Sequence, residues 1–325
     1  MCKINDFISY FLSFYDFYVY LCKMMSYKDR INARETHRMM GAPTITVRGR
    51  LLDLTSPQVM GILNATPDSF YEESRTLSEE TIAQRADEIV GQGGAMVDIG
   101  AFSTRPGGEE VTQQEEMRRL RLALSVVTRR HPDVIVSVDT FRPDVARMAV
   151  EEYGAAMIND VSEGGITGVA GVARREKREE VPAMFRTVAD LGVPYILMSV
   201  RPRLHDMMKS FAEEVGLLHS LGVKDIILDP GFGFGKTLDE NYQLLSELDG
   251  LQVMGLPVLV GVSRKSMIYR LLDGTPADAL NGTTVLHTIA LQKGASILRA
   301  HDVRAAVEVC RIVEKLTSPS LSINS

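Results

Sequence analysis

Cysteine is scarce in this 325-residue chain, which contains only Cys2, Cys22 and Cys310. Three cysteines form no disulfide framework, and these have no metal-ligand spacing, so we expect a reducing, cytoplasmic location. The six histidines include no pair at metal-ligand spacing either. A structural or catalytic zinc site is therefore disfavoured.

An excess of basic residues is also lacking. Lys and Arg number 36 and Asp and Glu 42, which gives a formal net charge of −6 and no support to a general nucleic-acid-binding surface. The apolar and aromatic run at residues 7–22 is shorter than the about 20 residues of a membrane-spanning helix, and Asp16 interrupts it. We expect neither a nucleic acid nor a membrane as partner. Hydrophobic residues at 45% and charged residues at 24% are typical of a globular protein.

The first 41 residues differ in composition from the rest and carry many of the aromatic side chains. They lack the basic start and the small-residue cleavage site of a signal peptide. We interpret residues 1–41 as a poorly ordered extension or a non-native start; a packing or membrane-surface element and a targeting segment are the alternatives. We expect one domain at residues 42–318 and a tail at residues 319–325.

From residue 58 onward, short apolar runs alternate with stretches of helical periodicity. Near-continuous apolar runs are typical of parallel strands buried on both faces. The predicted strands are residues 59–63, 96–99, 134–138, 156–158, 195–198, 225–228, 257–260 and 296–298. Eight strands with connecting helices predict a (β/α)8 TIM barrel, with a doubly wound sheet as the alternative. The gap between the last two strands has room for two helices.

The last predicted helix, residues 303–316, has an apolar stripe that includes Val307, Ile312 and Val313. Such a stripe faces either the barrel or a second copy of the chain. We expect most of its residues to face the barrel.

Polar residues follow almost every predicted strand, where a barrel enzyme carries its chemistry. Any one of them could simply cap the next helix, as Asp139 could cap a helix that begins near Pro143. Together, carboxylates, amides and cations at these positions indicate a polar, partly anionic ligand. The positions that follow the predicted strands are Asn64, Ser103–Arg105, Asp139–Thr140, Asn159–Asp160, Met198–Ser199, Asp229–Gly231, Ser263–Lys265 and Arg299–His301.

The segment at residues 229–237 is rich in glycine but is not a phosphate-binding loop, because Pro230 stands where that pattern needs glycine. Two interpretations remain open. Phe232 and Phe234 either flank a planar ligand or are buried in a tight turn.

Seven segments together resemble the dihydropteroate synthase family, the pterin-binding barrels of folate synthesis. They are residues 60–70, 98–106, 137–140, 158–161, 228–236, 261–266 and 298–302, and their order matches the family's. The resemblance implies a transferase that joins 6-hydroxymethyl-7,8-dihydropterin diphosphate to p-aminobenzoate and releases pyrophosphate. A catalytically inactive pterin-binding paralogue is the main alternative. A pterin-dependent methyltransferase is disfavoured by residues 103–106 and 263–266.

The resemblance also implies site residues, carried over position by position. The pterin would contact Asp139, Asn159, Met198, Asp229 and Lys265, and catalysis would depend on Asp139, Lys265 and Arg299. The diphosphate would contact Asn64, Arg105, Arg299 and His301, with Mg²⁺ held by Asn64 and Asp68. The p-aminobenzoate would contact Thr104, Arg105, Pro106, Phe232, Lys265 and Ser266. Family resemblance further implies a homodimer and a sulfonamide target.

The chain departs from the family after the fifth predicted strand. The family usually has Met-His-Met-Gln there, and this chain has Met198-Ser-Val-Arg-Pro202. The segment at residues 166–181 is longer than usual, and the N-terminal extension has no counterpart. The first departure concerns the outer wall of the expected pterin pocket.

Overall fold

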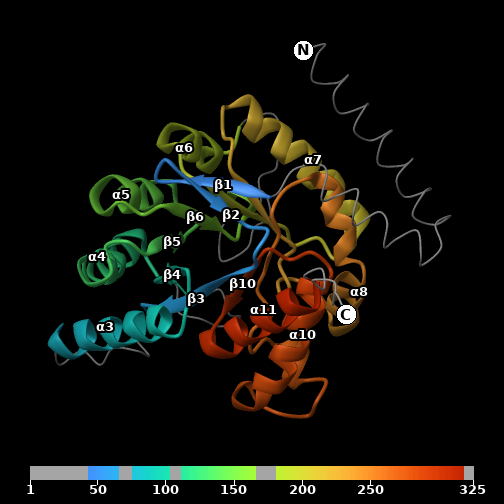
Figure 1. Cartoon of the computed structure of the whole chain (residues 1–325). Coiled ribbons are helices and arrows are strands. Elements are labelled where there is room, and N and C mark those ends of the chain that lie inside the picture. The colour runs from blue at the N-terminus through green and yellow to red at the C-terminus, as the bar shows by residue number, and fades with distance from the viewer. Residues whose placement is uncertain (1–42, 66–74, 103–110, 166–180, 318–325) are drawn as a thin grey trace, which may run out of the picture.

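The structure is a computed structural model that describes residues 43–65, 75–102, 111–165 and 181–317 (Figure 1). The N-terminal extension, Asp68 and residues 103–106 lie outside these ranges. Within them, no helix is both long and apolar enough to cross a membrane.

Eight parallel strands form one sheet in the order β8-β7-β6-β5-β4-β3-β10-β9. The sheet closes between β8 and β9, where Leu228 bridges to Val258 and its N–H donates to the Pro257 carbonyl at 2.9 Å. Closure confirms the predicted barrel and excludes the open doubly wound sheet. The strands are β3 (Gln58–Asn64), β4 (Met96–Gly100), β5 (Ile135–Asp139), β6 (Met157–Asp160), β7 (Tyr195–Met198), β8 (Ile226–Asp229), β9 (Leu259–Val260) and β10 (Ile297–Ala300).

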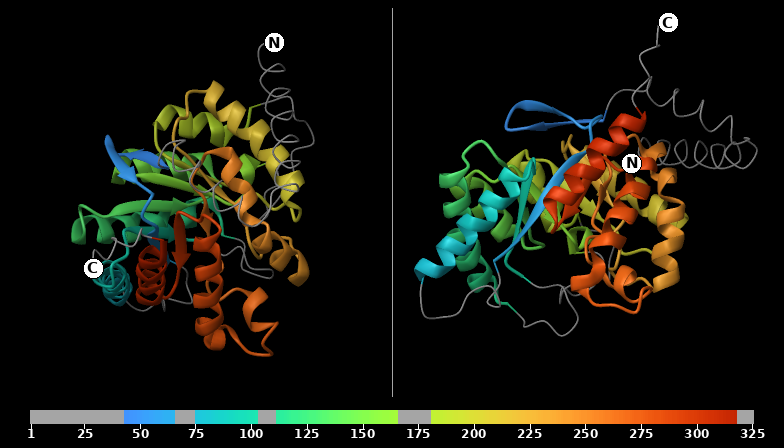
Figure 2. Two further views of the ribbon diagram at one scale, coloured as in Figure 1. Left: turned by 45° about the vertical axis from the view of Figure 1, so that its right-hand side comes forward. Right: turned by 60° about the horizontal axis from the view of Figure 1, so that its bottom comes forward.

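Helices surround the strands (Figures 1 and 2). They are α3 (Arg75–Gly91), α4 (Gln113–Arg130), α5 (Pro143–Tyr153), α6 (Ala183–Leu191), α7 (Leu204–Ser220), α8 (Leu238–Ser246), α9 (Ser266–Tyr269), α10 (Leu280–Gln292) and α11 (Val303–Thr317). The sequence analysis expected room for two helices between the last two strands. Helices α9 and α10, between β9 and β10, confirm this expectation.

The main core lies between the outer face of the strands and the inner faces of the helices. In α11, Val303, Cys310 and Val313 are buried there, which confirms that most of its apolar stripe faces the barrel. Ile312 was placed on the same stripe, and that was wrong: it is 62% exposed, and Leu316 is 70% exposed.

A hairpin that the sequence analysis missed precedes the barrel. Strands β1 (Thr44–Val47) and β2 (Arg50–Asp53) pair antiparallel around Arg48 and Gly49, which both have positive φ, as a two-residue hairpin turn requires. Ile45 and Val47 pack against the lower inward-facing side chains of the barrel. Figure 2 shows this hairpin, in blue, at one end of the barrel.

The strand period of two then places polar side chains at the other end of the interior. The lower inward-facing residues are apolar: Met96, Met157, Ile196, Ile227 and Ile297. Two residues further along the same strands come Asp98, Asn159, Met198, Asp229 and Arg299. The barrel therefore has an apolar base and a mainly polar upper layer at its C-terminal end.

Candidate active site

Arg299 of β10 is held between two carboxylates at the C-terminal end of the barrel. Its Nε lies 2.6 Å from Oδ2 of Asp98, and its Nη2 lies 2.9 Å from Oδ2 of Asp139. Asn159 donates from Nδ2 to the same Asp98 oxygen at 3.0 Å. Asp98 has no exposed surface. The guanidinium thus joins β4, β5 and β10 across the interior.

Several polar atoms beside this ion pair have no hydrogen-bond partner among the described residues. They are Oδ1 of Asp98, Oγ of Ser137 and Oδ1 of Asn159, all buried. Buried polar groups are nearly always hydrogen-bonded, because leaving one unpaired costs free energy. Three of them in neighbouring strands indicate a polar ligand that supplies the missing partners.

Asp139 does not cap the following helix. The N-cap of α5 is Arg142, which makes no side-chain capping hydrogen bond, and the Asp139 carboxylate accepts from Arg299 instead. Asp139 is therefore available at the upper end of the interior.

Asp229 ends β8, and Lys265 follows β9 just before α9, at the same end of the barrel. Asp229 Oδ1 accepts from the Gly231 N–H at 2.7 Å. Lys265 Nζ donates to the Phe232 carbonyl and lies 4.5 Å from the centre of the Phe234 ring. The Phe232 side chain has no exposed surface and belongs to the main core, as expected of a tight turn, whereas Phe234 is partly exposed.

Burial shifts the ionisation of these groups toward neutral pH. It raises the pKa of Asp139 to about 7, although Arg299 acts in the opposite direction. It lowers the pKa of Lys265 to about 7, against the effect of Asp229. It also raises the pKa of Asp229, which Lys265 opposes. Strongly shifted groups that gather in one place are typical of catalytic sites.

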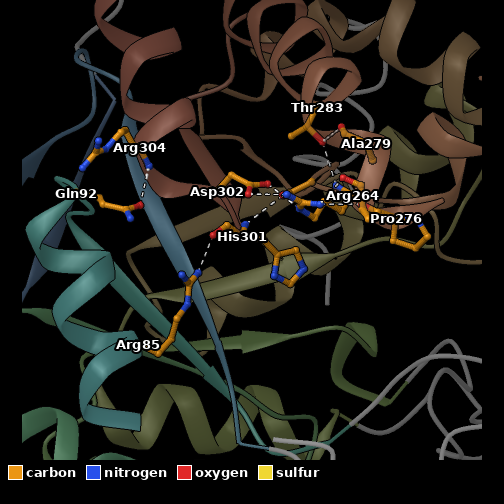
Figure 3. A network of polar contacts seen from close by, with 11 residues as sticks. Arg85, Gln92, Arg264, Pro276, Ala279, Thr283, His301, Asp302 and Arg304 are labelled. Carbon is orange, nitrogen blue, oxygen red and sulfur yellow. Dashed lines mark hydrogen bonds and ion pairs between the residues drawn. The ribbon is translucent and has the colours of Figure 1, made fainter. Parts of the chain in front are cut away.

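A second set of polar groups lies where β3 and β10 end. Asn64 is exposed there and lines a cavity of about 340 Å³ together with Arg85 and His301. Arg85 of α3 donates from Nε to the Ile62 carbonyl at 3.1 Å. Its Nη2 donates to the His301 carbonyl at 2.7 Å (Figure 3). One side chain thus ties the ends of both strands together.

The loop that carries Lys265 is tied to the end of β10 by an ion pair (Figure 3). Arg264 donates to both oxygens of Asp302 at 2.8 Å. The His301 N–H donates to Oγ of Ser263 at 3.1 Å. Residues 263–265 and 301–302 therefore form one unit, with Ser266 partly exposed as the first residue of α9.

Arg142 contacts both described ends of the connection between β4 and α4. Its guanidinium lies 5.7 Å from the centre of the Phe102 ring, and Nη2 donates to the Val111 carbonyl at 2.7 Å. The same side chain pairs with buried Glu116, which also accepts from Oγ1 of Thr140 at 2.7 Å. The ends of this connection are thereby fixed beside the end of β5.

The structure brings most of the predicted site residues to one end of the barrel. Asp139, Asn159, Met198, Asp229, Lys265 and Arg299 line or border the upper interior, and Asn64 and His301 border the adjacent cavity. Asp68, Thr104, Arg105 and Pro106 lie outside the described residues. The sequence analysis assigned no role to Asp98, Ser137 or Arg85. The signal for Asp98 was its place two residues after Met96, at an inward position of the strand.

The sequence of this barrel matches a known family over most of its length. A family model described as pterin binding enzyme matches residues 60–301. The chain belongs to this family. It is 36% identical to the dihydropteroate synthase of Escherichia coli K12 over 286 residues, which cover 83% of this chain and 95% of that protein. It is also 36% identical to the dihydropteroate synthase of Bacillus subtilis over 266 residues, covering 79% and 88%.

Solved structures of dihydropteroate synthases have the same fold. The Yersinia pestis enzyme in a sulfonamide drug complex aligns with a TM-score of 0.72 at 36% identity, covering 84% of this chain and 98% of that one. The Xanthomonas albilineans enzyme with 4-aminobenzoic acid aligns with a TM-score of 0.75 at 34% identity, covering 86% and 99%.

Proposed function

We propose that this chain is a dihydropteroate synthase. It joins 6-hydroxymethyl-7,8-dihydropterin diphosphate to p-aminobenzoate and releases pyrophosphate. The observation that carries the proposal is a row of three buried oxygen atoms that have no hydrogen-bond partner among the described residues, with Asp139 and Asp229 nearby. They are Oδ1 of Asp98, Oγ of Ser137 and Oδ1 of Asn159. Relatives of this name at 36% identity support it.

The pterin occupies the upper interior of the barrel. Its aminopyrimidine edge presents N–H donors beside a carbonyl oxygen. Asp139, Asn159 and Asp229 accept from the donors, and Lys265 donates to the carbonyl. Met198 packs against the ring from the end of β7. This assignment gives a partner to the buried amide oxygen of Asn159.

The bond to the diphosphate breaks early, and positive charge develops on the pterin methylene carbon. A carboxylate placed in advance near this carbon stabilises that charge, which is the role of Asp139. Arg299 and His301 bind the negative diphosphate at the end of β10. The amine nitrogen of p-aminobenzoate then forms a bond to the methylene carbon and loses a proton to solvent, and the pyrophosphate already cleaved from that carbon is released.

Magnesium fits the diphosphate end of the site. Magnesium usually keeps several waters and takes one or two side-chain oxygens along with substrate phosphates. Among the described residues, no three His, Cys, Asp or Glu side chains gather as a metal site, so the amide oxygen of Asn64 would hold the ion together with diphosphate oxygens, and Asp68 would assist. Bound there, magnesium neutralises charge on the departing pyrophosphate.

The arylamine binds on the outer side of the pterin, between Lys265, Ser266 and residues 104–106, next to the turn in which the Phe232 side chain is buried. Sulfonamide drugs resemble p-aminobenzoate and would compete for this place. The Yersinia pestis enzyme has been solved in a sulfonamide drug complex, which supports this part of the proposal. We also propose a cytoplasmic homodimer. Exposed Val285, Ile312 and Leu316 lie on α10 and α11, which pack against each other, and they supply apolar surface for a second copy.

Pyrophosphate release by the purified protein tests the proposal. The pterin diphosphate and magnesium are supplied with and without p-aminobenzoate. Release that requires the arylamine, together with formation of 7,8-dihydropteroate, is the expected result. A protein that binds the pterin but releases no pyrophosphate would instead be an inactive paralogue.

A further inference from the structure

The ammonium group of Lys236 joins two loops beside the pterin site. It donates to the carbonyls of Gly231 and Phe234 at 2.8 and 3.3 Å, both in the loop after β8. It also donates to the Ser199 carbonyl at 3.1 Å, in the loop after β7. All three hydrogens of one lysine are thus used on backbone oxygens of the protein itself.

The two loops lie against each other without spare room. The Ser199 N–H donates to the Asp229 carbonyl at 2.9 Å. A Cβ atom on Gly231, whose φ is +63°, would lie 2.2 Å from the Ser199 oxygen. The three carbonyl oxygens that converge on Lys236 would repel one another unless a cation or donor lay between them. Lys236 supplies that cation.

The carboxylates that act on Lys236 come from the ends of β6 and β8 and, as Glu240, from α8. Buried Glu163 and Asp229 favour its charged form, while burial lowers the pKa of Lys236 to about 8. Glu163 has no exposed surface and sits in a turn fixed by Asp160, which accepts from the N–H groups of Ser162 and Gly164 at 2.7 and 2.9 Å. The loops after three successive strands therefore surround one ammonium group.

These loops carry the proposed pterin contacts. Met198 immediately precedes Ser199, and Asp229 begins the loop that ends at Lys236. Lys236 binds the carbonyls of Gly231 and Phe234, and Phe232 lies between these two residues in the sequence. The Phe232 carbonyl accepts from Lys265. The segment Met198-Ser-Val-Arg, which departs from the family pattern, includes the start of the loop after β7.

We propose that Lys236 is a positioning residue for the pterin site, acting by holding the loops after β7 and β8 together. It fixes Met198 against Asp229, and both of these residues are assigned to the pterin alone. This inference rests on the proposed function, because its effect is measured as a change in pterin use.

Steady-state kinetics of Lys236→Met tests the inference. The substitution keeps much of the chain length and removes all three donors. Lys293→Met is the matched control, because Lys293 also donates to a carbonyl, that of Ser246 at 2.6 Å, but just after α10, at the N-terminal end of the barrel. We expect KM for the pterin diphosphate to rise about tenfold or more in Lys236→Met. KM for p-aminobenzoate should change far less, and Lys293→Met should keep both wild-type constants.

Three results would overturn the inference. One is a lower melting temperature of Lys236→Met with unchanged kinetics, which would make the lysine purely structural. Another is an equal rise in both KM values. A third is the same pterin defect in the Lys293 control. Absence of arylamine-dependent pyrophosphate release from the wild type would be a different result, since it would reject the proposed function itself.

Gly231→Ala gives a second test. The single variant serves by itself if Lys236→Met folds poorly, and a double-mutant cycle follows if both variants fold. Gly231→Ala pushes the same two loops apart while the Lys236 side chain itself is kept. It should raise the pterin KM by itself, and its effect should be less than additive with that of Lys236→Met, because both changes disrupt one contact. Wild-type kinetics of Gly231→Ala, or full additivity, would contradict the inference.

Discussion

Asp98 and Arg299 form an ion pair inside the barrel, with Oδ2 and Nε 2.6 Å apart and no part of Asp98 exposed. The other end of the guanidinium contacts Asp139, at the upper end of the interior. One carboxylate thus anchors Arg299 from within, which leaves Asp139 available for substrate.

Replacing Asp98 by Asn tests this anchoring role. The substitution keeps the shape but leaves Arg299 with a weakened partner, and breaking a buried ion pair costs about 3 kcal/mol of unfolding free energy. We expect that loss in urea denaturation, together with a fall in kcat/KM of about 100-fold.

Asp190→Asn is the control for this prediction. Asp190 pairs with Arg147 at 3.2 Å on the surface, where both side chains are exposed. Its replacement should change stability by less than about 0.5 kcal/mol and leave kinetics unaltered. A stable and fully active Asp98→Asn variant would show that Arg299 needs no buried anchor.

Activity should peak in a narrow range around neutral pH. Burial raises the pKa of Asp139 to about 7, so its carboxylate is lost as the pH falls below that value. Burial lowers the pKa of Lys265 to about 7, so its ammonium is lost as the pH rises. A site that needs both charged forms gives a bell-shaped profile of kcat/KM for the pterin diphosphate.

The variant Lys265→Arg separates the two limbs of this profile. Arginine stays charged at every pH that the protein tolerates. The residual activity should therefore keep the acid limb and lose the alkaline limb. An alkaline limb that persists in this variant would assign it to another group.

Buried His287 should make the protein less stable in acid. Neither ring nitrogen has a hydrogen-bond partner among the described residues, and burial lowers the pKa of His287 to about 4. Between pH 6.5 and 4 the unfolded chain takes up a proton that the folded chain refuses, so stability falls as the pH falls. The loss reaches about 3 kcal/mol once the pH is below 4.

His287→Leu should remove this part of the pH dependence, as measured by urea unfolding at pH 7 and pH 4. Replacement of the exposed His219 by Gln should leave the difference between the two pH values as in the wild type. The same acid sensitivity in His287→Leu as in the wild type would assign it to other groups.

The barrel and most of its polar upper layer could be predicted because both depend on local patterns. Apolar runs mark the buried strands, and a polar residue at a strand end, such as Asp229 or Arg299, stands out against them. Asp98 was harder to recognise, because it lies inside the apolar run that defines its strand. The hairpin of β1 and β2 was missed because neither strand forms an apolar run: exposed and buried residues alternate in β1, and β2 has no buried residue.

Other features depend on contacts between distant residues. Nothing in the neighbourhood of Arg85 indicates that its guanidinium reaches the end of β10, 216 residues away. Burial of the Phe232 side chain likewise depends on the surrounding core. Contacts of this kind can be seen only in the folded chain. The local sequence of a helix or a glycine-rich loop is compatible with many different long-range partners and does not select one.

The bridge made by Arg85 predicts a defect confined to the diphosphate end. Arg85→Met removes the link between the Ile62 and His301 carbonyls and lets the ends of β3 and β10 separate. Affinity for the pterin diphosphate should fall about tenfold. Binding of 6-hydroxymethylpterin, which has no diphosphate, should stay near the wild-type value in titration calorimetry.

Arg304→Met is a matched control for Arg85→Met, because exposed Arg304 bonds to Gln92 through its backbone N–H, which the substitution keeps (Figure 3). Equal weakening of both pterins by Arg85→Met would mean that the bridge supports the whole barrel mouth rather than its diphosphate end.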